Sequence, residues 1–274
     1  MKNIGININS EKDPENKILN DILKILGNEC KIFVFNDCRG IPEKSSQLDM
    51  ILSIGGDGTT LRTARSVVKN AVPILSVNFG NLGFLTTAEG TNLESTLNKV
   101  LNNQYYIEDR MMLECDFKGG NSRDKLFSLN DIVLCKGTLS RVVNYELSID
   151  DKIYNSLVAD GIIISTPTGS TAYSLSAGGP IIYPTLDVIS ITPICPLFLN
   201  MRSFILNSDN NISLKISDTN EPVFLTIDGQ EAFELCNDNK INIRKSKYKT
   251  KLIKTYDYDY FSTLRKKIIS RIKE

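Results

Sequence analysis

The chain has 274 residues, of which 41% are hydrophobic and 23% charged, and its 32 Lys and Arg residues equal its 32 Asp and Glu residues. This length allows one large domain or two smaller ones. The zero net charge argues against a sequence-independent nucleic-acid binder, because such proteins carry a basic excess. The chain contains no histidine, which excludes Ser-His-Asp triads, Cys-His dyads, Cys₂His₂ zinc fingers and HExxH metalloproteases.

Strand-like and helical segments alternate along the first hundred residues. Short apolar runs predict strands at residues 3–8, 31–35, 48–54 and 72–77. Between and after them, apolar residues at helical spacing predict helices at 18–26, 59–68 and 93–101. This alternation predicts an α/β domain with a Rossmann-like, doubly wound parallel sheet.

The pattern changes after residue 104. Short β-type runs separated by turn residues occur at 105–117, 126–135, 142–149, 161–165, 212–216, 223–227 and 241–243, which predicts an all-β unit. Residues 264–272 return to helical spacing, and we expect this C-terminal helix to return to the first domain. The predicted domains are therefore an α/β domain at 1–104 plus 255–274 and an all-β domain at 105–254.

Two features bear on location and assembly. The six cysteines are scattered with no CxxC pair and the N-terminus does not resemble a signal peptide, so we expect a cytoplasmic protein with reduced thiols. Residues 161–201 carry only one charge, Asp187, but five prolines interrupt them, which argues against a membrane span. Such a neutral segment is suited to burial against a ligand, another domain or another subunit, and we expect a homodimer or homotetramer built through the β domain.

The sharpest motif of the first domain is the run Gly55-Gly56-Asp57-Gly58-Thr59, where a predicted strand gives way to a helix. Its glycines let phosphate oxygens approach the backbone N–H groups. A carboxylate about 4 Å from a phosphate charge costs about 4 kcal/mol at an effective dielectric constant of about 20. Asp57 therefore suggests a metal or a proton to accept, and capping of a helix that starts near Thr59 is the alternative.

Three further segments carry polar or aromatic groups. The loop 78–86 contains Phe84, which could face an adenine ring or simply be buried in a Gly-rich turn. Asn130 and Asp131 suit the two hydroxyls of a ribose or a metal, although Asn-Asp before a strand is also an ordinary turn. The run 160–180 is rich in hydroxyls and glycines, and its Tyr173 offers a ring for stacking and a hydroxyl for hydrogen bonding.

These motifs together resemble the NAD kinase family. Residues 55–59 resemble its GGDGT motif, 78–86 its NxGxLGFLT loop and 228–230 its DGQ turn. Residues 165–181 are similar to the long STPTGSTAYSLSAGGPI segment of the family at every position. The GGDGT motif alone is shared with diacylglycerol and sphingosine lipid kinases and with phosphofructokinases, so the long segment carries the resemblance.

The resemblance implies that ATP, with Mg²⁺ or another divalent cation, phosphorylates the adenosine ribose 2′-hydroxyl of NAD to give NADP. It implies Asp57 as the general base and no metal ligand that can be assigned directly. The implied ATP phosphate-binding residues are Gly55, Gly56, Gly58 and Thr59. The implied NAD-binding residues are Asp57, Gly58, Phe84, Asn130, Asp131, Asp160, Thr171, Ala172, Tyr173, Ser174, Leu175, Ser176, Cys195 (from a neighbouring subunit) and Gln230.

The chain departs from the family pattern at three positions. Asp131 stands where the family has Glu, Val158 where many members have Arg, and Leu197 where many have His. The last two changes remove polar groups near the site, so the sequence leaves the phosphate-donor and NADP preferences open. Two other functions remain open at this point: a lipid kinase built on the same GGDG turn, and a non-catalytic NAD(P)-binding sensor.

Overall fold

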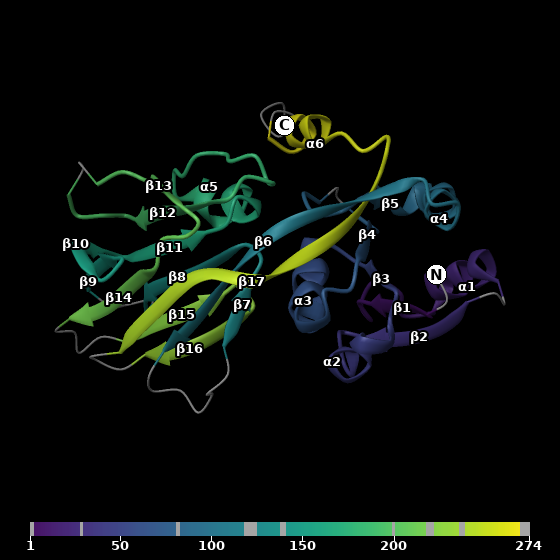
Figure 1. The fold of residues 1–274 in the computed structure, drawn as a ribbon, viewed down its shortest axis with the longest axis horizontal. Coiled ribbons are helices and arrows are strands. Elements are labelled where there is room, and N and C mark those ends of the chain that lie inside the picture. The colour runs from purple at the N-terminus through teal and green to yellow at the C-terminus, as the bar shows by residue number, and fades with distance from the viewer. Residues whose placement is uncertain are drawn as a thin grey trace. The chain divides into compact units, whose positions relative to one another are not determined.

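The structure, a computed structural model, describes residues 3–27, 30–80, 83–117, 125–137, 141–198, 201–217, 222–235 and 239–268. The chain divides into two compact units. Unit 1 comprises residues 1–109 and 250–274, and unit 2 comprises residues 110–249. Figure 1 follows the chain through both.

Unit 1 is built on a parallel sheet with the strand order β2-β1-β3-β4. Its strands are β1 (Asn3–Ile8), β2 (Lys31–Asn36), β3 (Met50–Ile54), β4 (Ile74–Asn78) and the short β5 (Ala88–Glu89). Its α-helices are α1 (Lys17–Leu26), α2 (Ile41–Lys44), α3 (Asp57–Val67), α4 (Leu93–Leu101) and α6 (Tyr260–Ile268). Three 3₁₀ turns, η1 (Ser45–Gln47), η2 (Val68–Asn70) and η3 (Gly90–Asn92), complete it.

The two faces of this sheet differ in chemistry because alternate residues of a strand point to opposite faces. Ile4, Ile6 and Ile8 of β1 join an apolar cluster with residues of α1 and α4. On the opposite face, Asn7 and Ser53 hydrogen-bond to Thr63 of α3. Helix α3 is therefore held on the sheet by buried polar contacts, and its N-terminus lies at the carboxyl end of β3.

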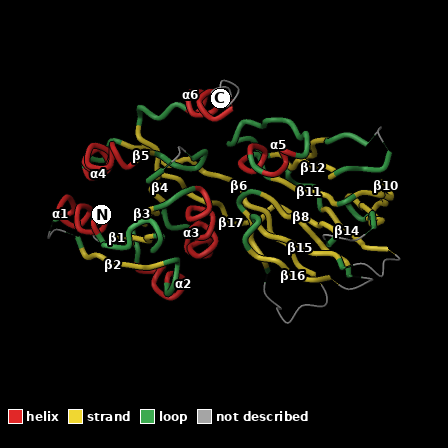
Figure 2. The backbone as a smooth tube through the Cα atoms, turned by 180° about the vertical axis from the view of Figure 1, so that it is seen from behind, coloured by secondary structure: helices red, strands yellow, loops and turns green. Residues whose placement is uncertain are grey.

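Unit 2 is built mainly from strands, which are yellow in Figure 2, and these strands pair antiparallel. One sheet has the order β13-β12-β11-β8-β15-β16 and the other contains the run β10-β9-β14-β17. The strands are β6 (Tyr105–Phe117), β7 (Leu126–Ser128), β8 (Asp131–Lys136), β9 (Val143–Ile149), β10 (Lys152–Ala159), β11 (Gly161–Ser165), β12 (Val188–Ile194), β13 (Phe204–Asn207), β14 (Ile212–Ser217), β15 (Val223–Ile227), β16 (Glu231–Leu235) and β17 (Lys240–Thr255). The short helices η4 (Thr168–Thr171) and α5 (Tyr173–Ser176) follow β11.

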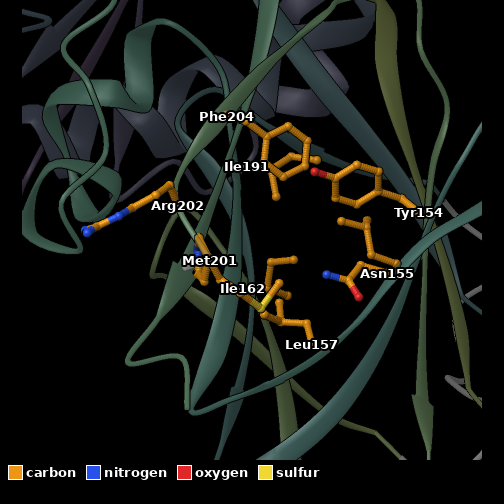
Figure 3. Close-up of a pocket in the computed structure, with 10 residues that line it drawn as sticks. Tyr154, Asn155, Leu157, Ile162, Ile191, Met201, Arg202 and Phe204 are labelled. Carbon is orange, nitrogen blue, oxygen red and sulfur yellow. The ribbon is translucent and has the colours of Figure 1, made fainter. Parts of the chain in front are cut away.

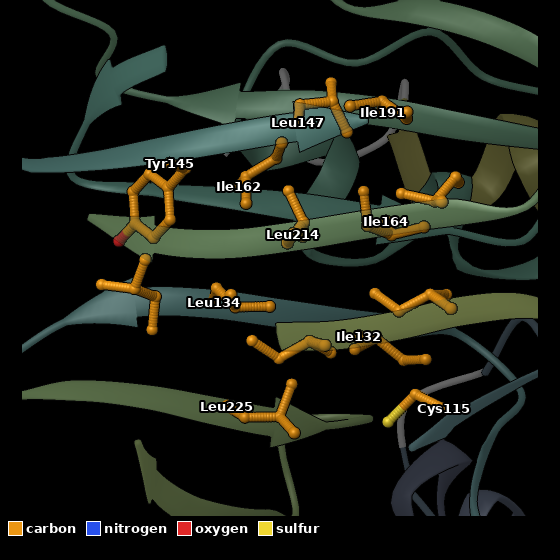
Figure 4. Packing of buried hydrophobic residues seen from close by; sticks show 14 of the residues in the cluster. Cys115, Ile132, Leu134, Tyr145, Leu147, Ile162, Ile164, Ile191, Leu214 and Leu225 are labelled. Carbon is orange, nitrogen blue, oxygen red and sulfur yellow. The ribbon is translucent and has the colours of Figure 1, made fainter. Parts of the chain in front are cut away.

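Alternating apolar residues of both sheets form the core of unit 2. Ile132 and Leu134 of β8, Ile162 and Ile164 of β11, and Leu214 of β14 belong to one buried cluster (Figure 4). The intervening residues of β8 and β11, Val133 and Ile163, form a smaller cluster on the other face of their sheet. The core therefore sits between the two sheets, as in a β-sandwich.

The predicted fold class is confirmed: a Rossmann-like α/β unit, a β-rich unit, and a C-terminal helix, α6, that belongs to the first. Several details differ from the sequence prediction. The run 126–135 is split into β7 and β8, strands β10, β12, β13 and β16 were not predicted, and α6 begins at Tyr260. Residues 269–272 of the predicted helix lie outside the described residues. Among the described helices, none has the length and apolar character needed to cross a membrane.

Candidate functional site

The glycine-rich turn joins β3 to α3. Gly55 has a φ of +155°, and a Cβ added to it would lie 2.4 Å from Thr59 Oγ1, so only glycine fits without a shift. Gly56 is the N-cap of α3, and Asp57, Gly58 and Thr59 form its first turn. Backbone N–H groups and the helix dipole favour anions at such an end. The turn therefore has the backbone geometry of a phosphate site.

Asp57 does not cap a helix that starts near Thr59, because α3 begins at Asp57 itself. Its carboxylate instead accepts hydrogen bonds from two backbone N–H groups of the next loop, at 2.8 Å from Phe84 N and 3.1 Å from Leu85 N. A Cβ on Gly83 would lie 2.0 Å from Asp57 Oδ1. The sequence analysis did not single out Gly83, yet the absence of its side chain is what allows this approach.

The loop 78–86 follows β4 and reaches the same edge of the sheet as the glycine-rich turn. Its residues Asn81 and Leu82 lie outside the described residues. Phe84 is half-buried, and its ring centroid lies 5.6 Å from Lys267 Nζ of α6. The backbone N–H of Phe84 thus binds Asp57, while the ring of Phe84 lies within cation–π range of Lys267.

In unit 2, the turn between β7 and β8 carries Asn130 and Asp131. The carboxylate of Asp228, in the turn after β15, binds this segment. Asp228 Oδ1 accepts from Ser128 Oγ at 2.6 Å, Asn130 N at 2.8 Å and Asp131 N at 3.3 Å, and Oδ2 accepts from Leu129 N at 3.3 Å. The buried carboxylate of Asp228 therefore accepts hydrogen bonds from the backbone N–H groups of three consecutive residues, 129–131. The sequence analysis gave Asp228 no role beyond the DGQ motif.

The carbonyl side of the same turn is held by the segment after β11. Thr166 Oγ1 donates to Leu129 O at 2.6 Å, and Thr166 N donates to Asn130 O at 2.9 Å. A Cβ on Gly169 would lie 2.1 Å from Asn130 O, so the two backbones approach closely only because this residue is glycine. The predicted ribose-binding pair is thus fixed on both sides by buried polar groups.

Asp131 is buried and faces a second carboxylate. Burial foremost, and then the negative charge of Asp228, raise the pKa of Asp131 from its ordinary value to about 7. Asp131 can therefore exchange a proton near neutral pH.

Three other predicted residues, Asp131, Asp160 and Cys195, influence the pKa of Tyr173. Burial is the largest cause of the raised pKa of Tyr173, followed by the negative charges that Cys135, Cys195, Asp131 and Asp160 carry when they are ionised. Its side chain is 45% exposed. Tyr173 thus combines an accessible ring with a hydroxyl close to the carboxyl groups of the predicted NAD site.

The other predicted residues of unit 2 lie in the short helices next to Tyr173 or in turns that join the strands. Asp160 lies between β10 and β11 and pairs with Lys136 at 3.2 Å. Thr171 ends η4, Ala172 separates it from α5, and Ser174, Leu175 and Ser176 form α5 after Tyr173. Cys195, exposed and with a φ of +45°, directly follows β12. Gln230 is exposed in the turn between β15 and β16.

Unit 2 also contains a pocket of about 140 Å³ (Figure 3). It is lined by Leu147, Tyr154, Asn155, Leu157, Ile162, Ile191, Pro193, Met201, Arg202 and Phe204. None of the residues predicted from the sequence to bind NAD or ATP is among them. The pocket is therefore distinct from the predicted site residues.

Two family models match separate parts of the chain. Residues 7–105 match the ATP-NAD kinase N-terminal domain and residues 129–255 the ATP-NAD kinase C-terminal domain. The NAD kinase of Clostridium botulinum (strain Kyoto / Type A2) is 50% identical over 278 residues, covering 100% of this chain and 99% of that protein. The NAD kinase of Clostridium kluyveri (strain NBRC 12016) is 47% identical over 277 residues, covering 100% of this chain and 98% of that protein.

Two solved structures share the fold. Yeast NADH kinase complexed with NADH has a TM-score of 0.85 at 24% identity, covering 98% of this chain and 87% of that one. An NAD kinase from Archaeoglobus fulgidus in complex with ATP has a TM-score of 0.76 at 23% identity, covering 100% and 99%. With both domain models and full-length relatives matched, the chain belongs to the ATP-NAD kinase family.

Proposed function

We propose that this protein transfers the γ-phosphoryl group of ATP to the 2′-hydroxyl of the adenosine ribose of NAD, which gives NADP and ADP. The observation that carries the proposal is the Asp57 carboxylate, held by two backbone N–H groups at the start of a glycine-rich helix turn. An acidic group at a phosphate-binding helix end is unfavourable unless it has a chemical task, and proton abstraction from an alcohol is such a task.

Asp57 acts as the general base in this proposal. One of its carboxylate lone pairs takes the 2′-hydroxyl proton while the ribose oxygen bonds to the γ-phosphorus and the bond to the ADP oxygen breaks. The amides of Phe84 and Leu85 use only part of the acceptor capacity of the carboxylate, which offers about four lone-pair sites. The amides therefore orient the base and leave it able to accept the proton.

Phosphate binding is assigned to the turn before and within α3, at Gly55, Gly56, Gly58 and Thr59. The described residues form no group of three His, Cys, Asp or Glu side chains that could hold a metal. A magnesium ion would be bound mainly by the ATP phosphates, with at most a carboxylate or two from the protein. Bound in this way, the ion would neutralise developing phosphate charge.

NAD recognition is assigned to unit 2 and to the loop that contains Phe84. The residues are Asp57, Gly58, Phe84, Asn130, Asp131, Asp160, Thr171, Ala172, Tyr173, Ser174, Leu175, Ser176, Cys195 and Gln230. The rigid turn at Asn130 and Asp131 supports a role in binding ribose hydroxyls, because fixed donors and acceptors lose little entropy on binding. Tyr173 supports stacking against a planar ring, because its side chain is accessible.

We infer further that the protein is a cytoplasmic homodimer or homotetramer assembled through unit 2. Apolar side chains are exposed along residues 181–198, with Leu197 at 61% and Phe198 at 56%. Exposed apolar surface of this kind is typical of subunit interfaces. The free thiols of Cys38, Cys115, Cys135 and Cys195 support a reducing compartment.

The test is NADP formation by the purified protein from NAD, ATP and Mg²⁺, measured with an NADP-specific dehydrogenase. We expect turnover in the wild type and a loss of about 10²–10⁴-fold in Asp57→Asn, as for removal of a general base, with NAD binding retained. Asp151→Asn, a change at an exposed carboxylate in the turn between β9 and β10 of unit 2, is the control and should keep full activity.

Other outcomes separate the alternatives. Phosphorylation of diacylglycerol micelles in preference to NAD would indicate the lipid kinase. Tight NADP binding with no turnover from any donor would indicate the sensor. Full activity of Asp57→Asn would remove Asp57 from the role of base while leaving the reaction itself established.

A further inference from the structure

A lysine is buried in unit 1 at a position that the proposed reaction does not use. Lys254, near the end of β17, has 0% of its surface exposed. Burying an ammonium group is costly unless polar partners replace the lost water. The contacts of Lys254 should therefore show what its charge stabilises.

Its ammonium group binds the loop that follows β4. Lys254 Nζ donates to Leu85 O at 3.3 Å and to Thr86 O at 3.2 Å. It also lies 3.8 Å from the ring centroid of Tyr258, within cation–π range. Two carbonyls and an aromatic face thus compensate the buried charge.

The same loop holds Asp57 from its other side. The N–H groups of Phe84 and Leu85 donate to the Asp57 carboxylate, whereas the carbonyls of Leu85 and Thr86 accept from Lys254. Leu85 takes part in both sets of contacts through the two ends of one residue. Lys254 and Asp57 therefore bind neighbouring peptide groups of the same short loop segment.

Thr87, the residue after Thr86, attaches the end of this loop to β17, the strand that contains Lys254. Thr87 Oγ1 donates to Ile253 O at 2.5 Å, and Thr87 N donates to Ser76 O at 2.8 Å. The loop is thus fixed at Thr87 by β4 and β17, and Lys254 supplies a separate, charged attachment next to the amides that bind Asp57.

We propose that Lys254 is a positioning residue for Asp57: by binding the carbonyls of Leu85 and Thr86, it holds the amides that orient the carboxylate. The proposal rests on the proposed role of Asp57 as base. Lys254 does not act on substrate; it acts through the loop. Removing its charge should let the loop shift, and a misplacement of about 1 Å in such a site can cost about 100-fold in rate.

The experiment compares Lys254→Met, which keeps an unbranched side chain one atom shorter and removes the charge, with Lys254→Arg, which keeps the charge. We expect kcat to fall about tenfold to 100-fold in Lys254→Met, with the KM values for NAD and ATP changed less than twofold. Lys254→Arg should recover most of the lost kcat. Lys251→Met, on the same strand and half-buried, is the matched control and should retain wild-type kcat.

A double-mutant cycle with Asp57→Asn separates positioning from general support of the fold. If Lys254 acts through Asp57, Lys254→Met should cost little or nothing further in kcat once Asp57 is Asn. An equal loss in both backgrounds would overturn the proposal, as would unchanged kcat in a folded Lys254→Met protein. If Asp57→Asn alone keeps full activity, the proposed base is wrong, and this result is read independently of Lys254.

Folding is followed by thermal unfolding of each variant. If Lys254→Met does not fold, Lys254→Gln, which keeps donor groups without charge, takes its place in the cycle. If neither variant folds, Lys254 is required for the fold rather than for placing Asp57, and the proposal fails.

Discussion

Asp131 is a residue whose protonation should affect stability. Burial and the neighbouring Asp228 raise its pKa to about 7 in the folded protein, whereas the ordinary pKa of an Asp side chain is 3.8. Between these two values, the folded state binds more protons than the unfolded state. Stability therefore decreases as pH rises through this window, and the loss is complete above the folded pKa.

We predict that Asp131→Asn, which cannot ionise, removes this part of the pH dependence. Urea unfolding at pH 5 and pH 8 should show a smaller fall in the free energy of unfolding for the variant than for the wild type. Asp187→Asn, at a largely exposed carboxylate, is the control and should follow the wild type. Equal falls in Asp131→Asn and wild type would show that Asp131 is ionised throughout.

At the scale of elements, the turn between β15 and β16 supports the turn between β7 and β8. Asp228 links them through one hydroxyl and three backbone N–H donors, and its own N–H donates to Asp131 O at 2.9 Å. Hydrogen bonds to a charged group contribute about 1.5–3 kcal/mol each. The conformation of Asn130 and Asp131 thus depends on a residue distant in sequence.

We predict that Asp228→Ala raises the KM for NAD by about tenfold or more, since the loss of one charged hydrogen bond already corresponds to that factor, and leaves the KM for ATP unchanged. Asp150→Ala is the matched control, because Asp150 also has a positive φ (+49°) and accepts hydrogen bonds from Asn210 and Asn211 in unit 2. Steady-state kinetics with each substrate varied provide the measurement. Equal rises in both KM values would contradict a local effect on the NAD site.

The elements predicted correctly are those in which apolar residues recur at regular helical or strand spacing and few prolines or polar residues interrupt the pattern. Helix α4 and strands β1, β11 and β15 have the predicted bounds. Strand β12 was not predicted, because Pro193 and several hydroxyl residues interrupt its apolar pattern. The turn considered for Asn130 and Asp131 agrees with the break of 126–135 into β7 and β8. Its support by Asp228 and Thr166 could not be predicted, because these residues are far away in the sequence.

The same distinction applies to the candidate site. Glycine-rich turns and the hydroxyl-rich segment are local patterns, so the sequence suggested them directly. The supporting contacts are not local: Gly83 approaches Asp57, and Lys254 binds the carbonyls of Leu85 and Thr86. Nothing in the composition around Lys254 distinguishes it from the other lysines of residues 240–254, and only its burial does.

At the scale of the whole molecule, the proposed oligomer leads to a test. We predict that Phe198→Asp shifts the protein to a smaller species in light scattering coupled to size-exclusion chromatography, because a charge at a buried subunit interface is costly. Phe261→Asp, at a 58% exposed phenylalanine of unit 1, should leave the mass unchanged. A wild type that already elutes as a monomer would refute the assembly.

The chain enters unit 2 along β6 and leaves it along β17, so the second unit is an insertion within the first. This order has a consequence for biosynthesis. On the ribosome, residues 110–249 are complete before β17 can pair with β4 at Leu252 and Ile74. The first unit, although it begins earlier, must therefore be finished last, and the loop that orients Asp57 gains its buried cation only when Lys254 has left the exit tunnel.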